Sequence, residues 1–366
     1  MTGNQAHQKS INQALVMQAI RDTPGISRTE IAAATGLTKS TIGNLARQLR
    51  AAGLIRESEP ENGDESGGAG RPRVGLMLAE DAATVIGVEI RRDEIFSVTL
   101  NLAGSVLERR SSREIGTVGP FVTLQEAWQA AGTLLRTLQA PRCVGIGVAV
   151  PATTDPIRGT VVESEDFDVS GFNLESLTVI DAVVPVLLEN DANAVAWGAV
   201  AAGDVLVVTG RFDHATGVLR IGTGIVLDHR VFYGADFGAG EFRTIRWRAG
   251  MTGELAEHGG SGRAALVELC ENLSVPVSML RPQRVIVAGD LVERLDEIHE
   301  ILRGELSGAY IDPQVSGVPF VAAEDGEHAV ASGAAHMFLE HLFEIPGVER
   351  NRPQGIPRWQ DLPVGR

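Results

Sequence analysis

The sequence predicts an α/β protein in which a small helical segment precedes a larger body built from two similar halves. Three observations predict this class. Glycine is abundant, with 42 residues in 366, and aromatic residues make up only 5%, as is typical of chains with many tight turns between strands and helices. The first 56 residues show helical periodicity. One order of strands and helices then occurs twice in the remainder.

The net charge of −15 hides a difference between the two ends of the chain. Residues 1–56 contain seven basic and two acidic residues and therefore carry +5, which leaves −20 on the rest. A polyanion repels an acidic protein, so the total argues against nucleic acid, whereas the division indicates a basic binding module joined to an acidic body. No apolar run reaches the ~18 residues of a membrane helix, and residues 1–10 lack the apolar core of a signal peptide. We therefore expect a cytoplasmic protein without membrane contact.

Two of the three N-terminal helices are predicted from apolar periodicity. The first has an apolar stripe and breaks at residues 22–25; the stripe consists of Ile11, Leu15, Ala19 and Ile20. The third begins after Thr38, a good N-cap residue, and stops at Gly53. Its core face consists of Ile42, Leu45 and Leu49. A strand pair follows, at residues 54–56 and 74–78, separated by a polar, glycine-rich segment.

The second helix is predicted from its ends. Ser27 and Glu30 have the spacing of a capping box, and Gly36 ends the helix. Ile31 and Ala34 supply its buried side.

The body shows its repeated order in two runs of predicted elements. Three strands, a helix and an apolar strand are predicted at residues 84–90, 95–102, 105–109, 124–138 and 143–150. The same order returns at residues 205–209, 217–221, 224–232, 264–280 and 285–288. Two similar lobes with a cleft between them follow from this repetition. We divide the chain into residues 1–80, residues 81–343 and a C-terminal tail of residues 344–366, which is either a free tail or a clasp.

Three helices followed by a strand pair form the pattern of a winged helix-turn-helix, whose third helix enters the DNA major groove. The outward face of this helix has short hydrogen-bonding side chains that suit base edges and basic side chains that suit phosphates. The alternative is an ordinary solvated helix surface, but the local charge of +5 favours DNA. The predicted DNA-contacting residues are Ser27, Arg28, Thr29, Thr38, Lys39, Ser40, Thr41, Asn44, Arg47 and Arg50.

A second DNA-contacting element is predicted at Arg71-Pro72-Arg73. Proline keeps the backbone extended, and arginine suits the narrow minor groove of A·T tracts. The alternative is a linker in which Arg71 and Arg73 are simply solvated.

Motifs of the body resemble the ROK family (repressors, open reading frames, sugar kinases). The most specific are ENDANA at residues 189–194, GTG at residues 222–224 and GADFGAGE at residues 234–241, within a resemblance that extends over roughly residues 10–343. The resemblance implies an actin-like, sugar-kinase fold of two lobes. It also implies that a member with this N-terminal module is a transcriptional regulator that senses a sugar or a sugar phosphate.

The resemblance also implies a ligand site. Asp191 matches the aspartate that deprotonates the sugar hydroxyl in the family's kinases, and in a non-catalytic member it can accept a hydrogen bond from the sugar. Asn190 and Glu241 match positions that hold sugar hydroxyls. The alternative is that Asn190 and Asp191 cap the following helix, and both roles are compatible.

Departures from the family pattern argue against an enzyme. The family's kinases have an Asp-x-Gly-Gly-Thr loop around ATP phosphates, where this chain has residues 89–93, EIRRD. Arg91 and Arg92 replace glycines, so the backbone cannot approach phosphate closely, and Asp93 adds repulsion. The GTG loop is kept, but the glycine-rich residues after it are missing, as is the glycine-rich adenosine motif at residues 288–290. We therefore expect no ATP use and no cofactor.

The zinc-binding element of the family is also incomplete. Thr244 stands where the family has a histidine, and no cysteine lies between Glu241 and Cys270. His258 alone is expected to be a surface residue. Because only 47 residues separate Glu241 from Ala288, we expect a shortened second lobe without a metal site.

These observations predict a DNA-binding transcriptional repressor of sugar-utilisation genes. Its partners would be a double-stranded DNA operator and a sugar or sugar-phosphate effector, and it would act as a homodimer or a dimer of dimers. One alternative is a sugar kinase with an appended DNA-binding domain. The other is a ligand-independent regulator whose body only dimerises.

Overall fold

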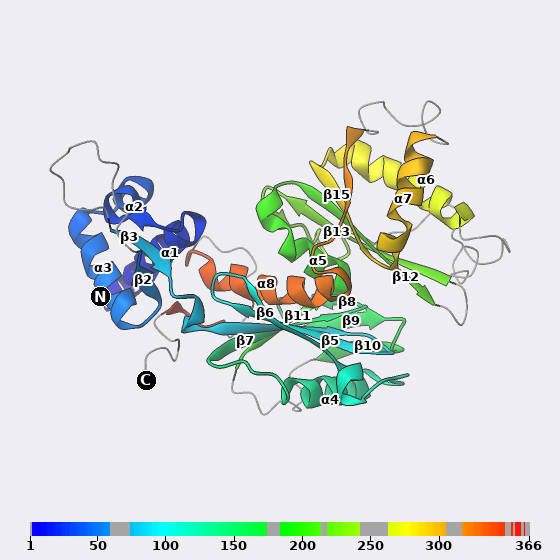
Figure 1. Ribbon diagram of the computed structural model, residues 1–366, viewed down its shortest axis with the longest axis horizontal. Coiled ribbons are helices and arrows are strands. Elements are labelled where there is room, and N and C mark those ends of the chain that lie inside the picture. Colours follow the sequence, from blue (N-terminus) through cyan, green and yellow to red (C-terminus); the bar gives the residue numbers. More distant parts are fainter. Residues whose placement is uncertain are drawn as a thin grey trace.

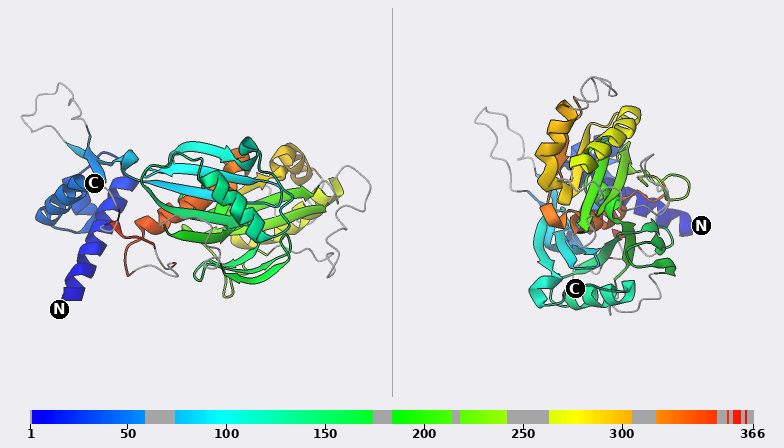
Figure 2. Two further views of the ribbon diagram at one scale, coloured as in Figure 1. Left: turned by 90° about the horizontal axis from the view of Figure 1, so that it is seen from below. Right: turned by 90° about the vertical axis from the view of Figure 1, so that its right-hand side faces the viewer.

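The computed structural model describes residues 2–58, 74–173, 184–213, 218–241, 263–304 and 317–347, together with residues 353, 356–359 and 362. A small helical domain lies at one end of a longer two-lobed body (Figure 1). The first turns of its N-terminal helix project beyond that domain (Figure 2). Within the described ranges, no helix has both the length and the apolar character needed to cross a bilayer.

The N-terminal domain is a winged helix-turn-helix, as predicted. Its helices are α1 (Thr2–Asp22), α2 (Arg28–Thr35) and α3 (Lys39–Ala51). Its antiparallel sheet has the order β1-β3-β2, formed by β1 (Ile26–Ser27), β2 (Ile55–Glu57) and β3 (Gly75–Leu78). The predicted core face of α3 is confirmed, because Ile42, Leu45 and Leu49 are buried.

The predicted faces of the first two helices are wrong in part. The buried face of α1 consists of Ser10, Gln13, Ala14, Val16, Met17 and Ile20, whereas Ile11 and Leu15 are only partly buried. Apolar residues lie on several sides of α1, so more than one stripe fits its sequence. On α2, Ile31 is buried but Ala34 is exposed, and Ala32 packs against the core instead.

The first lobe is a mixed sheet in the order β11-β7-β4-β5-β6, with β4, β7 and β11 parallel. Its strands are β4 (Thr84–Ile90), β5 (Ile95–Asn101), β6 (Val106–Ser111), β7 (Cys143–Val150) and β11 (Val186–Asn190). Helix α4 (Leu124–Leu135) packs on one face through Ala127, Trp128 and Leu134. A small sheet that the sequence analysis did not predict consists of β8 (Thr153–Asp155), β9 (Thr160–Ser164) and β10 (Val169–Asn173).

The second lobe repeats this topology. Its sheet has the order β14-β13-β12-β15-β16, in which β12, β15 and β16 are parallel. The strands are β12 (Val205–Asp213), β13 (Val218–Leu227), β14 (Arg230–Val231), β15 (Arg284–Gly289) and β16 (Phe320–Ala322). Its helices are α6 (Arg263–Leu280) and α7 (Leu295–Arg303). The predicted duplication is therefore confirmed. Single turns of 3-10 helix occur at Glu80–Ala82, Ser112–Ile115, Val200–Ala202, Asp290–Arg294 and Gly326–His328.

The prediction of a loop at Gly222-Thr223-Gly224 is wrong. These residues lie inside the continuous strand β13, opposite Thr209, Val208 and Val207 of β12. Glycine is needed here for close packing rather than for a turn, because a Cβ on Gly224 would lie 2.6 Å from the carbonyl oxygen of Ala192. The strand therefore passes directly beneath the helix that starts at Asp191.

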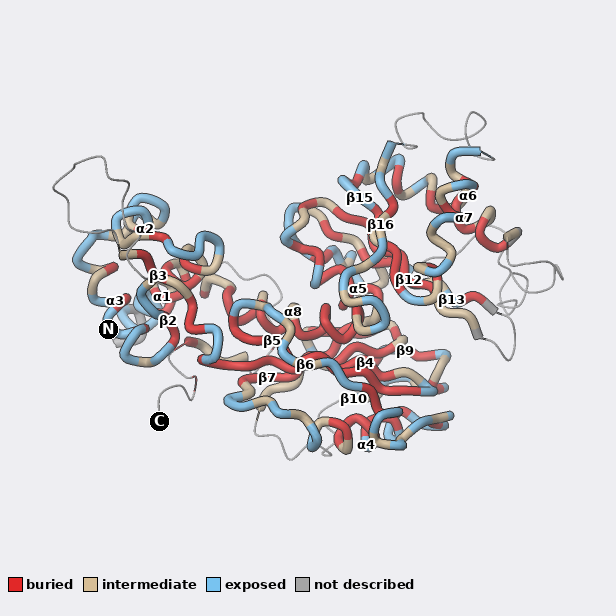
Figure 3. Tube along the Cα trace, in the orientation of Figure 1, coloured by how far each residue is buried: buried red, intermediate tan, exposed pale blue. Residues whose placement is uncertain are grey.

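Two helices that meet through small residues lie between the lobes. These are α5 (Asp191–Gly198) and α8 (Ala329–Phe343), and both belong to the main buried core (Figure 3). A Cβ on Gly333 of α8 would lie 1.9 Å from the carbonyl oxygen of Ala194, so the two helices meet backbone to backbone. The apolar core continues along α8 into the winged helix, where α1 contributes Val16, Met17 and Ile20. Trp359 and Leu362 of the C-terminal segment join the same core.

Candidate functional sites

The helix-turn-helix has capped helices on both sides of its turn. The Ser27 hydroxyl accepts a hydrogen bond from the amide of Glu30, whose carboxylate accepts one from the amide of Ser27, so the predicted capping box is confirmed. Gly36 ends α2 in the left-handed conformation. The Thr38 hydroxyl then accepts from the amide of Thr41 at 3.2 Å and caps α3. Ser27 and Thr38, predicted to contact DNA, thus already fix the ends of their helices.

The side of α3 opposite the core carries the predicted reading face. Lys39, Ser40, Asn44, Arg47 and Arg50 are exposed there. Arg47 donates to the side-chain oxygen of Asn44 at 3.1 Å, which aligns a cation with an amide on adjacent turns. Such a face can offer hydrogen bonds to base edges and positive charge to phosphates. Thr29 is exposed at the start of α2, whereas Arg71 and Arg73 lie outside the described residues.

Glu57 on β2 organises two of the predicted phosphate contacts. Its carboxylate forms ion pairs with Arg28 of α2 at 2.7 Å and Arg50 of α3 at 3.0 Å. The hydrogen bond from Arg28 and the charges of both arginines hold the pKa of Glu57 below its ordinary value. Glu57 was not predictable from the sequence, because its partners come from other elements of the fold.

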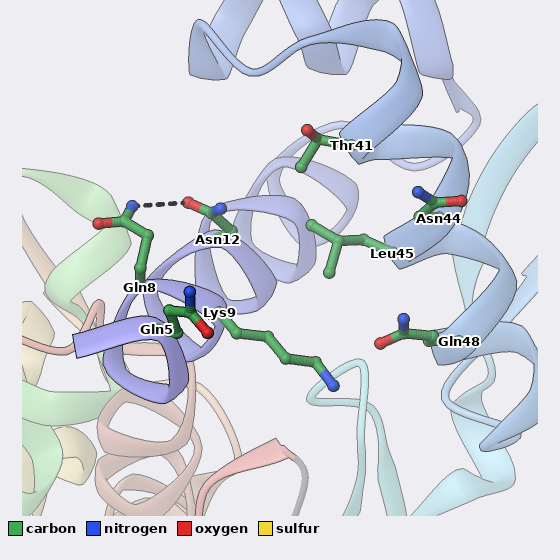
Figure 4. Close-up of a pocket in the computed structure, with 8 residues that line it drawn as sticks. All are labelled: Gln5, Gln8, Lys9, Asn12, Thr41, Asn44, Leu45 and Gln48. Atoms are coloured by element: carbon green, nitrogen blue, oxygen red, sulfur yellow. Dashed lines mark hydrogen bonds between the residues drawn. The ribbon is translucent and has the colours of Figure 1, made fainter. Parts of the chain in front are cut away.

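A polar groove separates α1 from α3 on the same domain (Figure 4). The Lys9 side chain extends from α1 toward α3, and Gln8 donates to Asn12 at 3.1 Å along the wall of the groove. No acidic residue is among those that line it, which are Gln5, Gln8, Lys9, Asn12, Thr41, Asn44, Leu45 and Gln48. The groove extends the basic and amide-rich surface of α3 onto α1.

The cleft between the lobes holds a cavity of about 260 Å³ that includes all three predicted ligand residues. Asn190 ends β11 and caps α5: its side-chain oxygen accepts from the amides of Ala192 and Asn193, and its amide group donates to the carbonyl of Ala152 at 2.9 Å. The capping role considered for Asn190 is therefore confirmed.

Asp191 begins α5 at the edge of the cavity. Burial raises its pKa from 3.8 to about 6, although the charge of Arg211 lowers it. Glu241 lies across the cleft on the other lobe and accepts a hydrogen bond from the Thr153 hydroxyl at 2.8 Å. The tertiary structure therefore brings Asp191 and Glu241, 50 positions apart, to one cavity as carboxylate acceptors for hydroxyl groups.

A buried network supports this cavity from behind. Glu189 accepts hydrogen bonds from Tyr233 at 2.5 Å, from Trp197 at 3.1 Å and from the amide of Asn190 at 2.8 Å. Burial raises the pKa of Glu189. Because these donors come from α5 and from the segment that leads to Glu241, the network sets the position of both walls. The sequence motif contained Glu189, but its partners were not predictable.

Arg91 follows strand β4 and lines the cavity from the first lobe. Its guanidinium donates to both oxygens of Glu89, at 2.5 and 2.9 Å, and its centre lies 4.3 Å from the ring centroid of Phe96. Burial opposes its charge, yet Glu89 raises the pKa of Arg91 above its ordinary value. Arg92 is exposed.

The predicted loss of a zinc site falls on residues 242–262, which lie outside the described residues together with Thr244 and His258. Elsewhere in the described chain, no three histidine, cysteine, aspartate or glutamate residues gather in a way that could hold a metal ion. Cys270 is buried and Cys143 is partly buried, and the two cysteines do not form a disulfide with each other.

A winged helix-turn-helix joined to a duplicated, actin-like α/β body defines the class of the protein. The chain belongs to the ROK family, whose model matches residues 85–269, and a model of the MarR family matches residues 10–64. A crystal structure of a ROK family transcriptional regulator, a homologue of the Escherichia coli Mlc protein, has a TM-score of 0.69 at 18% identity and covers 90% of this chain and 96% of its own. A crystal structure of a ROK family glucokinase from Streptomyces griseus, in complex with glucose and AMPPNP, has a TM-score of 0.54 at 21% identity. The match covers 69% of this chain and 98% of the glucokinase.

Curated relatives include xylose repressors. That of Caldicellulosiruptor bescii is 30% identical over 241 residues, which are 65% of this chain and 59% of the relative. The xylose repressor of Bacillus spizizenii is 23% identical over 388 residues, which cover 93% of this chain and 98% of the relative. The chain thus spans about three fifths of the length of the first of these relatives.

Proposed function

We propose that the chain is a DNA-binding transcriptional regulator that represses sugar-utilisation genes. The observation that carries this proposal is the exposed polar face of α3, with Ser40, Asn44 and Arg47 on a helix capped at its start and backed by a well-packed core. This geometry suits insertion into a major groove. The +5 charge of residues 1–56 supports the proposal, because a basic domain attracts DNA. The acidic body repels DNA and so confines the contact to this domain. Relatives that are named xylose repressor and DNA-binding transcriptional repressor Mlc agree with this proposal.

The test is binding to a DNA fragment taken from upstream of the protein's own gene, measured by fluorescence anisotropy at several salt concentrations. We expect binding that weakens as salt rises and that exceeds binding to a scrambled fragment. Arg47→Ala should weaken it, whereas Arg136→Ala, an exposed arginine in the first lobe, should not. Equal affinity for both fragments at low salt would overturn the proposal.

The cleft is the proposed effector site, with Asp191 and Glu241 accepting hydrogen bonds from sugar hydroxyls. Effector binding would shift the population of lobe arrangements, and with it the spacing of two winged helices in a homodimer or a dimer of dimers. Such a regulator acts where the DNA lies, in the cytoplasm. A body that served only for assembly would bind no sugar, so isothermal titration calorimetry with free sugars separates the two readings.

Sugar kinase activity is the second candidate, because the fold is shared with a ROK glucokinase and Asp191 lies in the cavity. We favour a non-enzymatic protein, because Arg91 stands at a sequence position where the family's kinases have a glycine of the phosphate loop, and its guanidinium already pairs with Glu89. ADP release across a panel of sugars is the measurement. Turnover that disappears in Asp191→Asn would establish the kinase instead.

A further inference from the structure

A buried carboxylate binds two arginines that come from opposite lobes. Glu89 lies on β4 of the first lobe and is fully buried. Besides its two bonds from Arg91, it accepts one from Arg211 of β12 at 2.9 Å. The two interacting residues Glu89 and Arg211 are 122 positions apart in the sequence and meet only across the cleft.

The basic side chains that line the cavity already form ion pairs with carboxylates of the protein. Arg91 also donates to the carbonyl oxygen of Glu327 at 3.2 Å, and its side chain is only 15% exposed. Arg220 of β13 pairs across the cleft with Asp166 of the first lobe at 2.7 Å. Each basic residue that lines the cavity in the described chain thus has a carboxylate partner, and Glu89 serves two of them.

The remaining charges on the cavity wall are negative. They belong to Asp191, Glu163, Glu165 and Glu241. An anionic ligand would face repulsion from these groups and would also have to displace Glu89 from its arginines. Displacement would leave a fully buried carboxylate without a partner, which is strongly unfavourable. Hydroxyl groups carry no such penalty, because each can donate to a carboxylate.

We propose that Glu89 determines the charge class of the effector: by binding Arg91 and Arg211, it makes the cavity accept an uncharged sugar and reject sugar phosphates and nucleotides. This inference rests on the proposed role of the cleft as the effector site. Free guanidinium groups would otherwise form a phosphate site, since arginine binds phosphate through two parallel hydrogen bonds. Glu89 is thus a specificity-determining residue, acting through the two arginines that it holds.

The first experiment uses the wild-type chain without DNA. Isothermal titration calorimetry is carried out with D-xylose, D-glucose, D-glucose 6-phosphate and inorganic phosphate. We expect at least one free sugar to bind, and D-glucose 6-phosphate and inorganic phosphate to bind at least about tenfold more weakly than that sugar. Tighter binding of either phosphate than of the free sugars overturns the proposal, and so does the absence of binding by both free sugars at tens of millimolar.

Variants then test Glu89 itself. Glu89→Gln keeps the side-chain shape but frees both arginines, so affinity for inorganic phosphate should rise at least about tenfold. Glu163→Gln is the matched control, because it removes the same charge from the cavity wall without releasing an arginine, and phosphate should still be rejected. Equal gains in the two variants would show that only net charge matters and would overturn the role of Glu89.

A third variant covers the case in which Glu89→Gln does not fold. Arg211→Gln leaves the buried pair of Arg91 and Glu89 intact and makes the cavity more negative. We expect phosphate to bind no more tightly than it does to the wild type, and a gain in phosphate affinity would overturn the proposal. DNA binding is measured separately for each folded protein. Failure of the wild type to bind DNA removes the proposed regulatory function, whereas phosphate preference with intact DNA binding removes only this inference.

Discussion

Arg21 of α1 and Glu340 of α8 form a two-point ion pair, with both nitrogen–oxygen distances at 3.1 Å, that joins the winged helix to the body. The guanidinium also lies 4.5 Å from the ring centroid of Phe343. At its other end, α8 reaches the cleft, where Val330 lines the cavity. One helix therefore contacts both the winged-helix domain and the proposed effector cavity, which gives a physical route by which effector binding can change DNA affinity.

The first prediction concerns this junction. Arg21→Met should lower the free energy of unfolding by about 1 kcal/mol, because the pair is only partly exposed. It should also reduce the change in DNA affinity that an effector produces, with a smaller effect on DNA affinity alone. Urea unfolding and anisotropy with and without sugar measure the two quantities. If Arg21→Met and Glu340→Gln both leave the effector response intact, α8 does not couple the sites through this pair.

The second prediction concerns Glu57. Glu57→Gln removes the carboxylate from Arg28 and Arg50, so both cations become available to phosphates and one negative charge leaves the DNA-facing side. Affinity for DNA of any sequence should rise, and the dependence of log affinity on log salt should steepen by about one to two ion equivalents. The matched control is Glu80→Gln, which removes an acidic partner of Arg56 farther from α3. Weaker binding by Glu57→Gln would mean that DNA binding requires the ion pairs themselves.

The third prediction concerns the groove between α1 and α3. If α1 flanks the DNA backbone, Lys9→Ala should weaken binding to specific and scrambled fragments by the same factor and reduce the salt slope by about one. Gln18→Ala, farther along the same helix, is the comparison. A loss confined to the specific fragment would instead assign Lys9 to base recognition.

The fourth prediction concerns pH. The pKa of Asp191 is about 6 in the folded protein against 3.8 in its ordinary state. Between these values the native state holds a proton that the unfolded chain has released, so this group makes the free energy of unfolding fall as pH rises toward 6. Asp191→Asn should remove that fall in urea unfolding. Sugar affinity should change in the opposite direction, increasing as pH rises through 6, because the ionised carboxylate is the better acceptor.

The fifth prediction concerns the contact between α5 and α8. Replacing glycine by alanine in a helix ordinarily stabilises it by up to about 1 kcal/mol. At Gly333 the clash should dominate, because the new methyl group would meet the backbone of Ala194, so Gly333→Ala should destabilise the protein by about 2 kcal/mol or more. Gly43→Ala in α3, where nothing lies within 4 Å, should instead stabilise it slightly. Urea unfolding of the two variants and of the wild type measures the change in the free energy of unfolding and gives the sign of each effect.

Local features were the ones that the sequence predicted well. The capping box of Ser27 and Glu30, the start of α3 at Thr38 and the core face of α3 depend on neighbours within one helix. The repeated order of strands was also readable, because buried parallel strands such as β7 are continuous apolar runs.

Features that depend on contact between distant segments were not predictable in this way. The glycines at residues 222–224 indicated a loop, whereas the strand needs them because α5 passes over it. Ala34 fitted a helical stripe but faces solvent, since Ile31 is a single large apolar residue and does not define the phase of a short helix. Glu57 was not singled out, because the pairing of an acidic residue with two arginines on other elements leaves no local pattern.

The sequence by itself determined the class of fold, the position of helix α3 and the family, because these depend on periodicity, caps and short motifs. Only the tertiary structure decided what Arg91 does. In the sequence it was an obstacle to phosphate; in the fold, it shares the buried carboxylate of Glu89, two positions away, with Arg211 from across the cleft. The reason is physical: the energy of a buried charge depends on all the partners that folding brings within a few ångströms, and one of these, Arg211, lies far away along the chain.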